Sequence, residues 1–168
     1  TSQMITHLSA GREALVIADS SVSSNVPVGA SRRVIEIDAR TANVETVVKT
    51  AREIVHHKPE VIVAVGGGTV LDASKLSALA LARERVFDFA VERSARSALT
   101  FLPDVPLPVD LVAVPTTIGT SSETNSVGIL KNETDFRLVV GRCLRPRHAI
   151  IDPCNLMTLS RSAVREGT

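Results

Sequence analysis

Three consecutive glycines, Gly66, Gly67 and Gly68, join an apolar run to a stretch that begins with Thr69. Free backbone N–H groups at a strand-to-helix turn, together with the positive end of a helix dipole, can bind an anion such as a phosphate group. Glycine also allows φ values that other residues avoid, and it lets the backbone approach a ligand closely. The glycines therefore predict a phosphate-binding turn, and a plain turn without a ligand is the alternative.

The residues after the glycines favour the start of a helix. Thr69 suits the N-cap position, and Asp72, three residues later, completes a capping-box pattern. The stretch contains neither G-x-G-x-x-G nor G-x-x-x-x-G-K-[ST]. The common dinucleotide fingerprint and the P-loop are therefore both excluded.

A second polar turn follows the apolar run 109–114 and extends from Pro115 to Asn125, with Thr116, Thr117 and Ser121 among its small polar residues. Two such turns at the carboxyl ends of strands would converge on one edge of a sheet, as a dinucleotide cleft requires. Asp19 ends another apolar run, 14–18, where a carboxylate can bind a ribose. An Asx-turn or helix cap formed with Ser20 and Ser21 explains Asp19 equally well.

Hydrophobic periodicity indicates the elements that would position these turns. Buried strands are expected at 14–18, 33–37, 61–65, 109–114 and 149–151, and a hairpin is expected from 126–130 and 138–140. An amphipathic helix should cover 44–55, capped by Thr41 or Asn43, and a second helix should follow the glycines to about Arg83. Segment 1–12 shows no pattern, and 87–108 suggests a loop with one helical turn at 91–98. The alternation predicts an α/β fold with a doubly wound, mostly parallel sheet.

The composition narrows the classes of function. The chain has 168 residues, of which 44% are hydrophobic, and it has four Phe but neither Trp nor Tyr. Because aromatic stacking platforms are absent and the net charge is +1, we expect no nucleic-acid or membrane partner. Cys143 and Cys154 are expected to be small buried thiols. The N-terminal residues lack the apolar segment of a signal peptide, so we expect a cytoplasmic protein.

Together, the two turns resemble the superfamily of iron-containing alcohol dehydrogenases and dehydroquinate synthases. Gly66-Gly67-Gly68-Thr69-x-x-Asp72-x-x-Lys75 is similar to the GGG[ST]-x-x-D-x-x-K signature of that superfamily. Residues 115–123 are similar to the PTTxGTxSE signature of its alcohol dehydrogenase branch. The resemblance extends from about residue 14 to 167 and implies a dinucleotide-binding domain at 1–155. A helical metal-binding domain would begin at 156–168 and continue beyond this chain.

The resemblance also implies a nicotinamide cofactor and assigns residues to it. The pyrophosphate would lie on Gly67, Gly68 and Thr69, and Asp72 would lie near the nicotinamide end. The adenosine side would be bordered by Thr116 and Thr117, with Ser121 in the same turn. Asp19 matches the carboxylate that favours NAD over NADP, because it would repel a 2′-phosphate and accept a ribose hydroxyl.

The implied reaction is hydride transfer between an alcohol or aldehyde and the nicotinamide, with Fe²⁺ or Zn²⁺ held by the helical domain. Nothing in residues 1–168 offers a three-ligand metal set at plausible spacing, and the sequence identifies no catalytic residue, so we expect this chain alone to be inactive. We also expect a homodimer.

Two alternatives remain at this point. Residues 156–167 resemble the dehydroquinate synthases more closely, which favours a sugar-phosphate cyclase. Phe136 falls where relatives carry a lysine that contacts the cofactor, which favours a non-catalytic cofactor-binding module.

Overall fold

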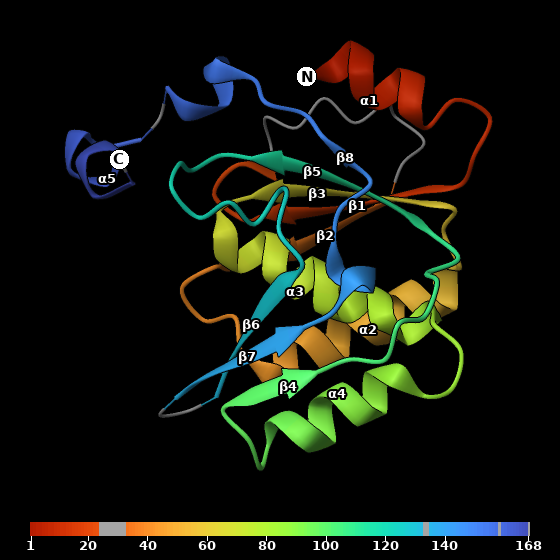
Figure 1. Ribbon diagram of the computed structural model, residues 1–168. Helices are drawn as coiled ribbons and strands as arrows, with labels where there is room; N and C mark the ends of the chain where they lie inside the picture. The colour runs from red at the N-terminus through yellow and green to blue at the C-terminus, as the bar shows by residue number, and fades with distance from the viewer. Residues whose placement is uncertain (24–32, 133–134, 158, 168) are drawn as a thin grey trace.

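The computed structural model describes residues 1–23, 33–132, 135–157 and 159–167 (Figure 1). Within these residues a five-stranded sheet has the order β2-β1-β3-β5-β8, and all its neighbouring strands run parallel. Its strands are β1 (Ala14–Asp19), β2 (Arg33–Ile37), β3 (Val61–Gly66), β5 (Asp110–Pro115) and β8 (His148–Ala149). The predicted α/β class with a mostly parallel sheet is therefore confirmed.

Helices cover both faces of this sheet because its central strands are apolar on both sides. All six residues of β3 are buried, and alternate residues contribute to two separate cores. On one face, Val16 and Val63 pack with Ile5 of α1 (Ser2–Leu8). On the other, Ile17 and Ile62 belong to the core formed with α2 (Val44–His57) and α3 (Gly68–Ala78). A sheet that is buried on both faces is the ordinary setting for parallel strands.

Helix α2 has the amphipathic face and the cap that the sequence predicts. Asn43 is its N-cap residue, and the side chain of Asn43 accepts a hydrogen bond from the Thr46 backbone N–H. Of the two predicted caps, Asn43 is therefore the one used. The helix ends at Lys58, whose φ of 45° lies in the left-handed region.

Helix α3 begins earlier than predicted. Its N-cap is Gly67, and Thr69 lies inside the first turn without a side-chain capping hydrogen bond. The predicted capping box of Thr69 and Asp72 is therefore wrong. It does not form because the Asp72 carboxylate is already bonded to Lys75 and to the backbone of Ile129. The 3₁₀ turn η2 (Leu79–Leu81) continues the helix almost to the predicted end.

A smaller sheet packs beyond α3. It has the order β4-β7-β6, formed by β4 (Leu99–Phe101), β7 (Phe136–Val140) and β6 (Val127–Lys131). The antiparallel pairing of β6 with β7 confirms the predicted hairpin. Helix α4 (Val86–Ser94) and β4 occupy the segment predicted as a loop with one helical turn at 91–98, so the helix is present but begins earlier than predicted, and the strand was not predicted. Helix α1 occupies the segment without a predicted element.

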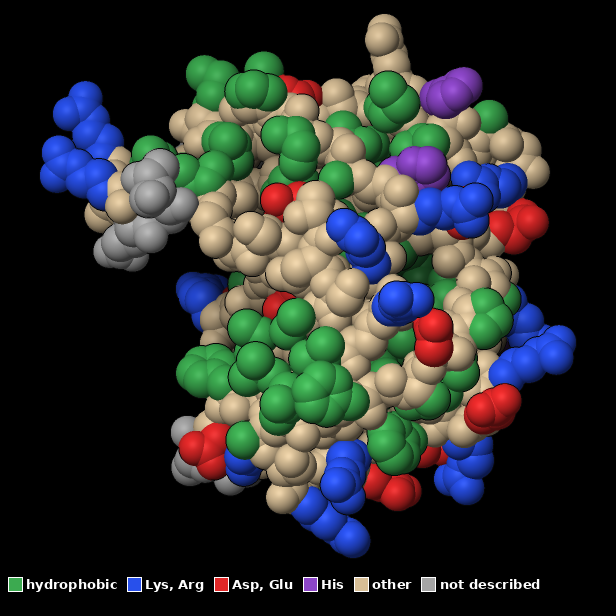
Figure 2. All heavy atoms as spheres, viewed as in Figure 1, with side chains coloured by type: hydrophobic (Ala, Val, Ile, Leu, Met, Phe, Trp, Pro, Cys, Tyr) green, Lys and Arg blue, Asp and Glu red, His purple; other side chains and the backbone are tan. Residues whose placement is uncertain are grey.

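The sequence gives no clear signal for these elements, because they bury few apolar residues or bury a polar residue in their place. In β4 the polar Thr100 is buried, whereas Leu99 and Phe101 are exposed, so the strand lacks the usual apolar inner face. Figure 2 shows hydrophobic side chains gathered over the small sheet, where exposed residues of all three strands lie: Leu99, Phe101, Ile129, Phe136 and Leu138.

The C-terminal part consists of η3 (Arg142–Leu144), η4 (Pro153–Leu156) and α5 (Arg161–Gly167). The domain boundary predicted at 155/156 stays a prediction, and Thr158 and Thr168 lie outside the described residues. Cys143 is half-buried, but Cys154 is exposed because it lies in the surface turn η4, which corrects the expectation of two buried thiols. No described helix is long and apolar enough to cross a membrane.

Candidate functional site

The side on which the chain adds successive strands to the parallel sheet changes at β1. From β1 the chain continues to β2 on one side, and β3 then lies on the other side of β1. In open α/β sheets, ligands bind at the carboxyl ends of the strands beside such a switch point. Asp19 ends β1 and Gly66 ends β3, so the predicted residues flank this position.

The two polar turns meet at the carboxyl edge, as predicted. Gly66 pairs with Pro115 in the ladder of β3 and β5, and the Thr116 backbone N–H donates to the Gly66 carbonyl at 3.0 Å. The glycine turn and the second turn therefore follow adjacent strands and lie side by side.

Lack of space, rather than an unusual φ, requires glycine in the first turn. Gly67 has a φ of −75°, and the described glycines with left-handed φ are Gly11 and Gly119. A Cβ atom added at Gly67 would lie 3.1 Å from the Thr117 methyl group, and one at Gly68 would lie 2.8 Å from the Thr120 methyl group. The expectation that these glycines supply unusual φ values is therefore wrong, whereas the expected close approach is present.

A cavity of about 630 Å³, here called the β1-side cavity, opens at this edge. Its lining includes six of the eight predicted cofactor residues: Asp19, Gly67, Gly68, Thr69, Thr116 and Thr117. The Oγ1 atom of Thr117 is buried and has no hydrogen-bond partner. A buried hydroxyl without a partner is costly, so the Thr117 Oγ1 atom is suited to bond a ligand in this cavity.

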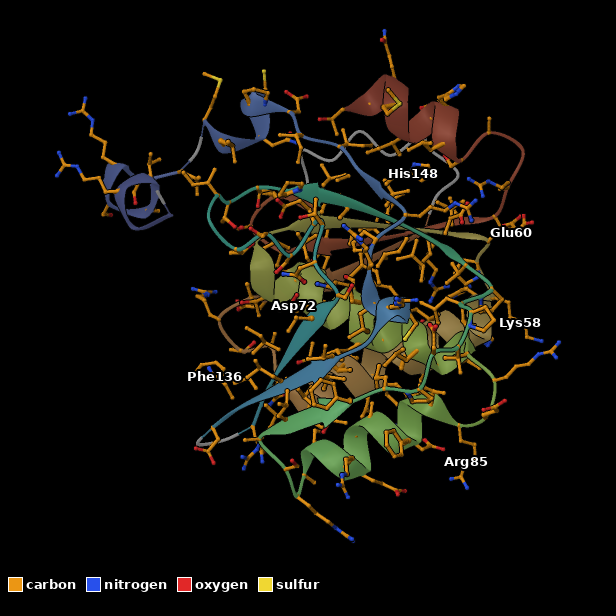
Figure 3. All side chains as sticks on the ribbon, viewed as in Figure 1. Lys58, Glu60, Asp72, Arg85, Phe136 and His148 are labelled. Carbon is orange, nitrogen blue, oxygen red and sulfur yellow. The ribbon has the colours of Figure 1, made fainter. Side chains whose placement is uncertain are left out.

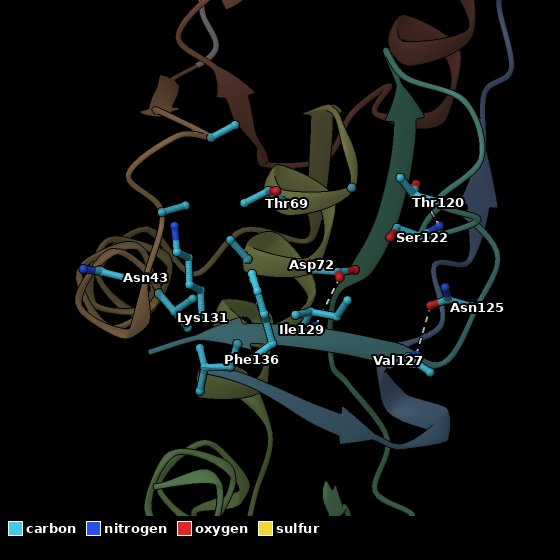
Figure 4. A pocket seen from close by; sticks show the side chains of 16 residues that line it. Asn43, Thr69, Asp72, Thr120, Ser122, Asn125, Val127, Ile129, Lys131 and Phe136 are labelled. Atoms are coloured by element: carbon cyan, nitrogen blue, oxygen red, sulfur yellow. Dashed lines mark hydrogen bonds between the residues drawn. The ribbon is translucent and has the colours of Figure 1, made fainter. Parts of the chain in front are cut away.

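A second cavity, of about 600 Å³, lies between α3, the N-terminal end of α2 and the β6–β7 hairpin (Figure 4). This hairpin-side cavity is lined by Asp72, Asn125, Ile129, Lys131 and Phe136 among others. Gly68, Thr69 and Thr120 line both cavities, which therefore adjoin at the first turn of α3.

Asp19 takes part in the local turn that the sequence left open as an alternative. Its Oδ1 atom accepts from the Ser21 backbone N–H at 2.8 Å and from the Ser21 hydroxyl at 2.7 Å. The side chain also lines the β1-side cavity. The turn therefore orients the carboxylate at the cavity wall, and the two interpretations are compatible.

Asp72 lies inside the protein with a partner that the sequence did not reveal. Its side chain projects from α3 toward the small sheet (Figure 3), and the residue is 4% exposed. Its Oδ1 atom accepts from the Lys75 ammonium group at 3.0 Å. Burial lowers the pKa of Lys75, and the Asp72 carboxylate opposes this shift. The i, i+3 spacing of the two residues was visible in the sequence, but nothing indicated that both are buried.

The remaining predicted cofactor residue, Ser121, lies outside both cavities, and Phe136 stands at the position predicted to lack the lysine of the relatives. Ser121 is exposed and has a φ of 53°. Phe136 lines the hairpin-side cavity opposite Lys131, its cross-strand partner in the hairpin. A lysine is thus present in this wall of the cavity, on the strand next to the position predicted for it.

The described residues contain no group of three or more His, Cys, Asp or Glu side chains that could hold a metal ion. The donor set of this part of the chain therefore does not match the three or four ligands of an iron or zinc site.

Curated relatives match the chain over most of its length. It is 37% identical over 107 residues to a mitochondrial hydroxyacid-oxoacid transhydrogenase of Caenorhabditis briggsae, covering 60% of this chain and 22% of the relative. It is 37% identical over 126 residues to the phosphonoacetaldehyde reductase of Streptomyces viridochromogenes, covering 73% of this chain and 31% of the relative. The chain thus spans less than a third of either relative.

The fold matches solved structures as well. Sulfoacetaldehyde reductase from Bifidobacterium kashiwanohense, solved in complex with NAD⁺, superposes with a TM-score of 0.75 at 21% identity, covering 96% of this chain and 44% of that protein. The family model for iron-containing alcohol dehydrogenase matches residues 2–153. From this match, and from the two signature turns at one edge of the sheet, the chain belongs to the iron-containing alcohol dehydrogenase family.

Proposed function

We propose that this chain is the NAD-binding part of an oxidoreductase that transfers hydride between an alcohol or aldehyde and nicotinamide. The observation that carries the proposal is the pair of cavities that adjoin at Gly68, Thr69 and Thr120. A dinucleotide has two nucleoside halves joined by a pyrophosphate, so it suits two cavities that meet at a helix N-terminus.

The residues present fit such a cofactor. Because Cβ atoms at Gly67 and Gly68 would crowd Thr117 and Thr120, the missing side chains leave the turn open to a pyrophosphate. The partnerless Thr117 hydroxyl can bond the adenosine half in the β1-side cavity. The nicotinamide half would then occupy the hairpin-side cavity, whose lining is largely apolar and suits a planar ring.

Asp19 favours NAD over NADP. Its carboxylate lines the β1-side cavity and is held at the wall by Ser21. There it can accept hydrogen bonds from a ribose diol, and it would repel a 2′-phosphate. The NAD⁺ complex of the sulfoacetaldehyde reductase supports the same choice of cofactor.

The nicotinamide ring supplies the hydride chemistry when it is bound. The protein residues bind the cofactor, orient it across the first turn of α3 and enclose its reactive half beside the hairpin. A divalent metal, iron or zinc, would come from residues outside those described, since these lack a matching ligand cluster. For this reason we expect the 168-residue chain alone to bind the cofactor without turning over an alcohol.

The dehydrogenase proposal is favoured over both alternatives. The curated relatives cited above are a transhydrogenase and a reductase, and the match to the family model covers both signature turns. These relatives support neither a sugar-phosphate cyclase nor a non-catalytic module. The predicted homodimer can be checked by light scattering of the purified chain.

Titration with reduced cofactors tests the proposal. We expect NADH to bind the 168-residue chain more tightly than NADPH, measured by fluorescence, and we expect Asp19→Gly to narrow this difference. Equal affinities of the wild type for both cofactors would remove Asp19 from the ribose site. Absence of binding to either cofactor would overturn the proposal, and tight zinc or iron binding in calorimetry would contradict our assignment of the metal to other residues.

A further inference from the structure

One lysine ammonium group lies wholly inside the protein. Lys75 is 1% exposed, and its Nζ atom donates to three oxygen atoms: Asp72 Oδ1 at 3.0 Å, the Ser122 carbonyl at 3.0 Å and Asn125 Oδ1 at 2.9 Å. An ammonium group has three N–H donors, so all of them are used. Asp72 belongs to α3, whereas Ser122 and Asn125 belong to the second turn.

The acceptors of Lys75 continue into the small sheet. Asp72 uses its other oxygen, Oδ2, to accept from the Ile129 backbone N–H at 3.1 Å. Asn125 Oδ1 also accepts from the Val127 backbone N–H at 3.0 Å. Both bonds are drawn in Figure 4, and they reach the first half of β6. Lys75 is thus the centre of a network that joins α3, the second turn and the hairpin.

The three elements joined by this network are also walls of the hairpin-side cavity. Asp72, Ser122 and Asn125 line that cavity, as do Val127 and Ile129, but none of the five lines the β1-side cavity. Lys75 itself lines neither cavity. It therefore has no access to a ligand and can act on one only through the groups that it holds.

Stability alone is a weak explanation for this network. Taking a lysine and a carboxylate out of water costs several kcal/mol per ion, and well-packed apolar residues often stabilise a core as well as a buried ion pair does. The network links three segments by directional bonds, directly from Lys75 to the second turn and through Asp72 and Asn125 to β6. Such bonds fix the distances between the segments, which apolar packing does not do.

We propose that Lys75 is a positioning residue that shapes the nicotinamide half of the cofactor site. The proposal rests on the proposed function, because it assumes that the hairpin-side cavity receives the nicotinamide. Through Asp72 and Asn125, Lys75 holds the second turn and β6 at the separation from α3 that the nicotinamide ring requires. Loss of the ammonium group should therefore weaken binding of a complete dinucleotide and spare binding of a ligand that lacks the nicotinamide ring.

Two ligands separate these halves. NADH spans both cavities, whereas ADP-ribose lacks the nicotinamide and reaches only as far as the adjoining ribose. For Lys75→Met we expect the NADH dissociation constant to rise about tenfold, which corresponds to about 1.4 kcal/mol. We expect the ADP-ribose dissociation constant to change by less than about twofold, an energy below about 0.5 kcal/mol. Fluorescence titration measures the first constant and calorimetry the second.

A matched control lies on the same helix. Ser74 is also fully buried, and its hydroxyl donates to the Val70 carbonyl of the same helix at 2.8 Å; neither residue lines either of the two cavities. Ser74→Ala should lower the melting temperature without changing either dissociation constant. Lys75→Gln, which keeps a side-chain donor, carries the same test if Lys75→Met does not fold.

Amide hydrogen exchange in the wild type gives a readout that needs no variant. NADH should slow exchange at Val127 and Ile129, and ADP-ribose should not. The inference is overturned if Lys75→Met raises both dissociation constants by the same factor, or if it raises neither. It is also overturned if both ligands protect these amides equally. If the wild type binds neither ADP-ribose nor NADH, the proposed function itself fails. That result is distinct from the results that overturn the role of Lys75.

Discussion

The two ends of the parallel sheet treat their polar groups in opposite ways. At the amino end, Asp110 begins β5 and accepts from Arg12 at 2.6 Å and from Arg147 at 3.1 Å. These charged groups are satisfied by one another. At the carboxyl end, the Thr117 hydroxyl is buried without a partner and the glycine turn faces open cavities. The comparison indicates that the amino end serves stability, whereas the carboxyl end leaves the Thr117 hydroxyl able to bond a ligand.

The largest effect is expected at the carboxyl end, for Gly68→Ala. The added methyl group would lie 2.8 Å from Thr120 Cγ2 and would fill the space proposed for the pyrophosphate. At NAD concentrations of about 100 times Kd, the wild type should gain about 2.7 kcal/mol of stability, and the variant should gain none of it. Thermal melts with and without NAD measure this difference.

Gly141→Ala is the matched control for this crowding. A Cβ atom there would lie 2.8 Å from Leu102 Cβ, and neither residue lines either of the two cavities. This variant should melt at a lower temperature but keep its NAD-induced rise. If Gly68→Ala also keeps the full rise, the glycine turn does not bind the cofactor and the comparison of the two ends loses its basis.

Gly119→Ala sharpens the comparison, because it should disturb the carboxyl end through the backbone. Gly119 has a φ of 89°, in the region that favours glycine. An alanine there should lower the free energy of unfolding by about 1–2 kcal/mol. Urea unfolding measures the loss, and NADH titration should show a smaller loss of affinity than in Gly68→Ala. An unchanged unfolding curve would contradict the role of Gly119 in the second turn.

Asp110→Asn tests the amino end. The Arg12 guanidinium holds the pKa of Asp110 below its usual value, with a further contribution from Arg147. A lowered pKa in the folded state adds stability above the unfolded pKa of about 4, and this stability is lost as the pH falls through the lower folded value. At pH 7 the variant should lose about 1 kcal/mol of unfolding free energy.

The pH dependence of this loss identifies its cause. The difference between Asp110→Asn and the wild type should be constant from pH 7 to about pH 5 and should shrink as the pH falls below about 4. NADH affinity should be unchanged at pH 7. A fall in NADH affinity at constant fold would show that the two ends are not independent.

Thr69→Val should have the smallest effect on stability. Thr69 is exposed and makes no capping hydrogen bond, so its hydroxyl contributes little to α3, and valine keeps the branched shape. We expect the unfolding free energy to change by less than about 0.5 kcal/mol. If the hydroxyl bonds a phosphate, NADH affinity should fall about threefold to tenfold, as for one hydrogen bond of about 1 kcal/mol. A large drop in melting temperature without ligand would restore the capping role.

The sequence predicts the elements in which the burial of side chains follows a regular pattern. Strands such as β3 are buried on both faces, so a run of apolar β-branched residues is enough to identify them. Helix α2 has one buried stripe and a capping Asn43, which the spacing reveals. In contrast, α1 buries little besides Ile5, and β4 buries a threonine between exposed apolar residues, so neither gives a periodic signal.

In the glycine turn, one of the two predicted reasons for glycine is confirmed, the close approach, and the other, an unusual φ, is wrong. The sequence identifies three glycines after a buried strand, and the family resemblance assigns them to a pyrophosphate. Only the structure reveals that they are required by the side chains of Thr117 and Thr120, which lie on the other turn. The distance between residues about 50 positions apart depends on how β3 and β5 pair, and no local pattern encodes it.

The sequence by itself therefore determined the parallel α/β class and the two turns at the carboxyl edge, because local periodicity and turn chemistry specify them. The assignment of cofactor residues came from the family resemblance and stays a prediction. Tertiary structure alone decided how those turns are held. Lys75 and Asp72 are charged residues that statistics place on the surface, yet both are buried, because partners from the second turn and β6 meet them inside. A buried charge is stable only with such partners, and these come together only when the chain has folded.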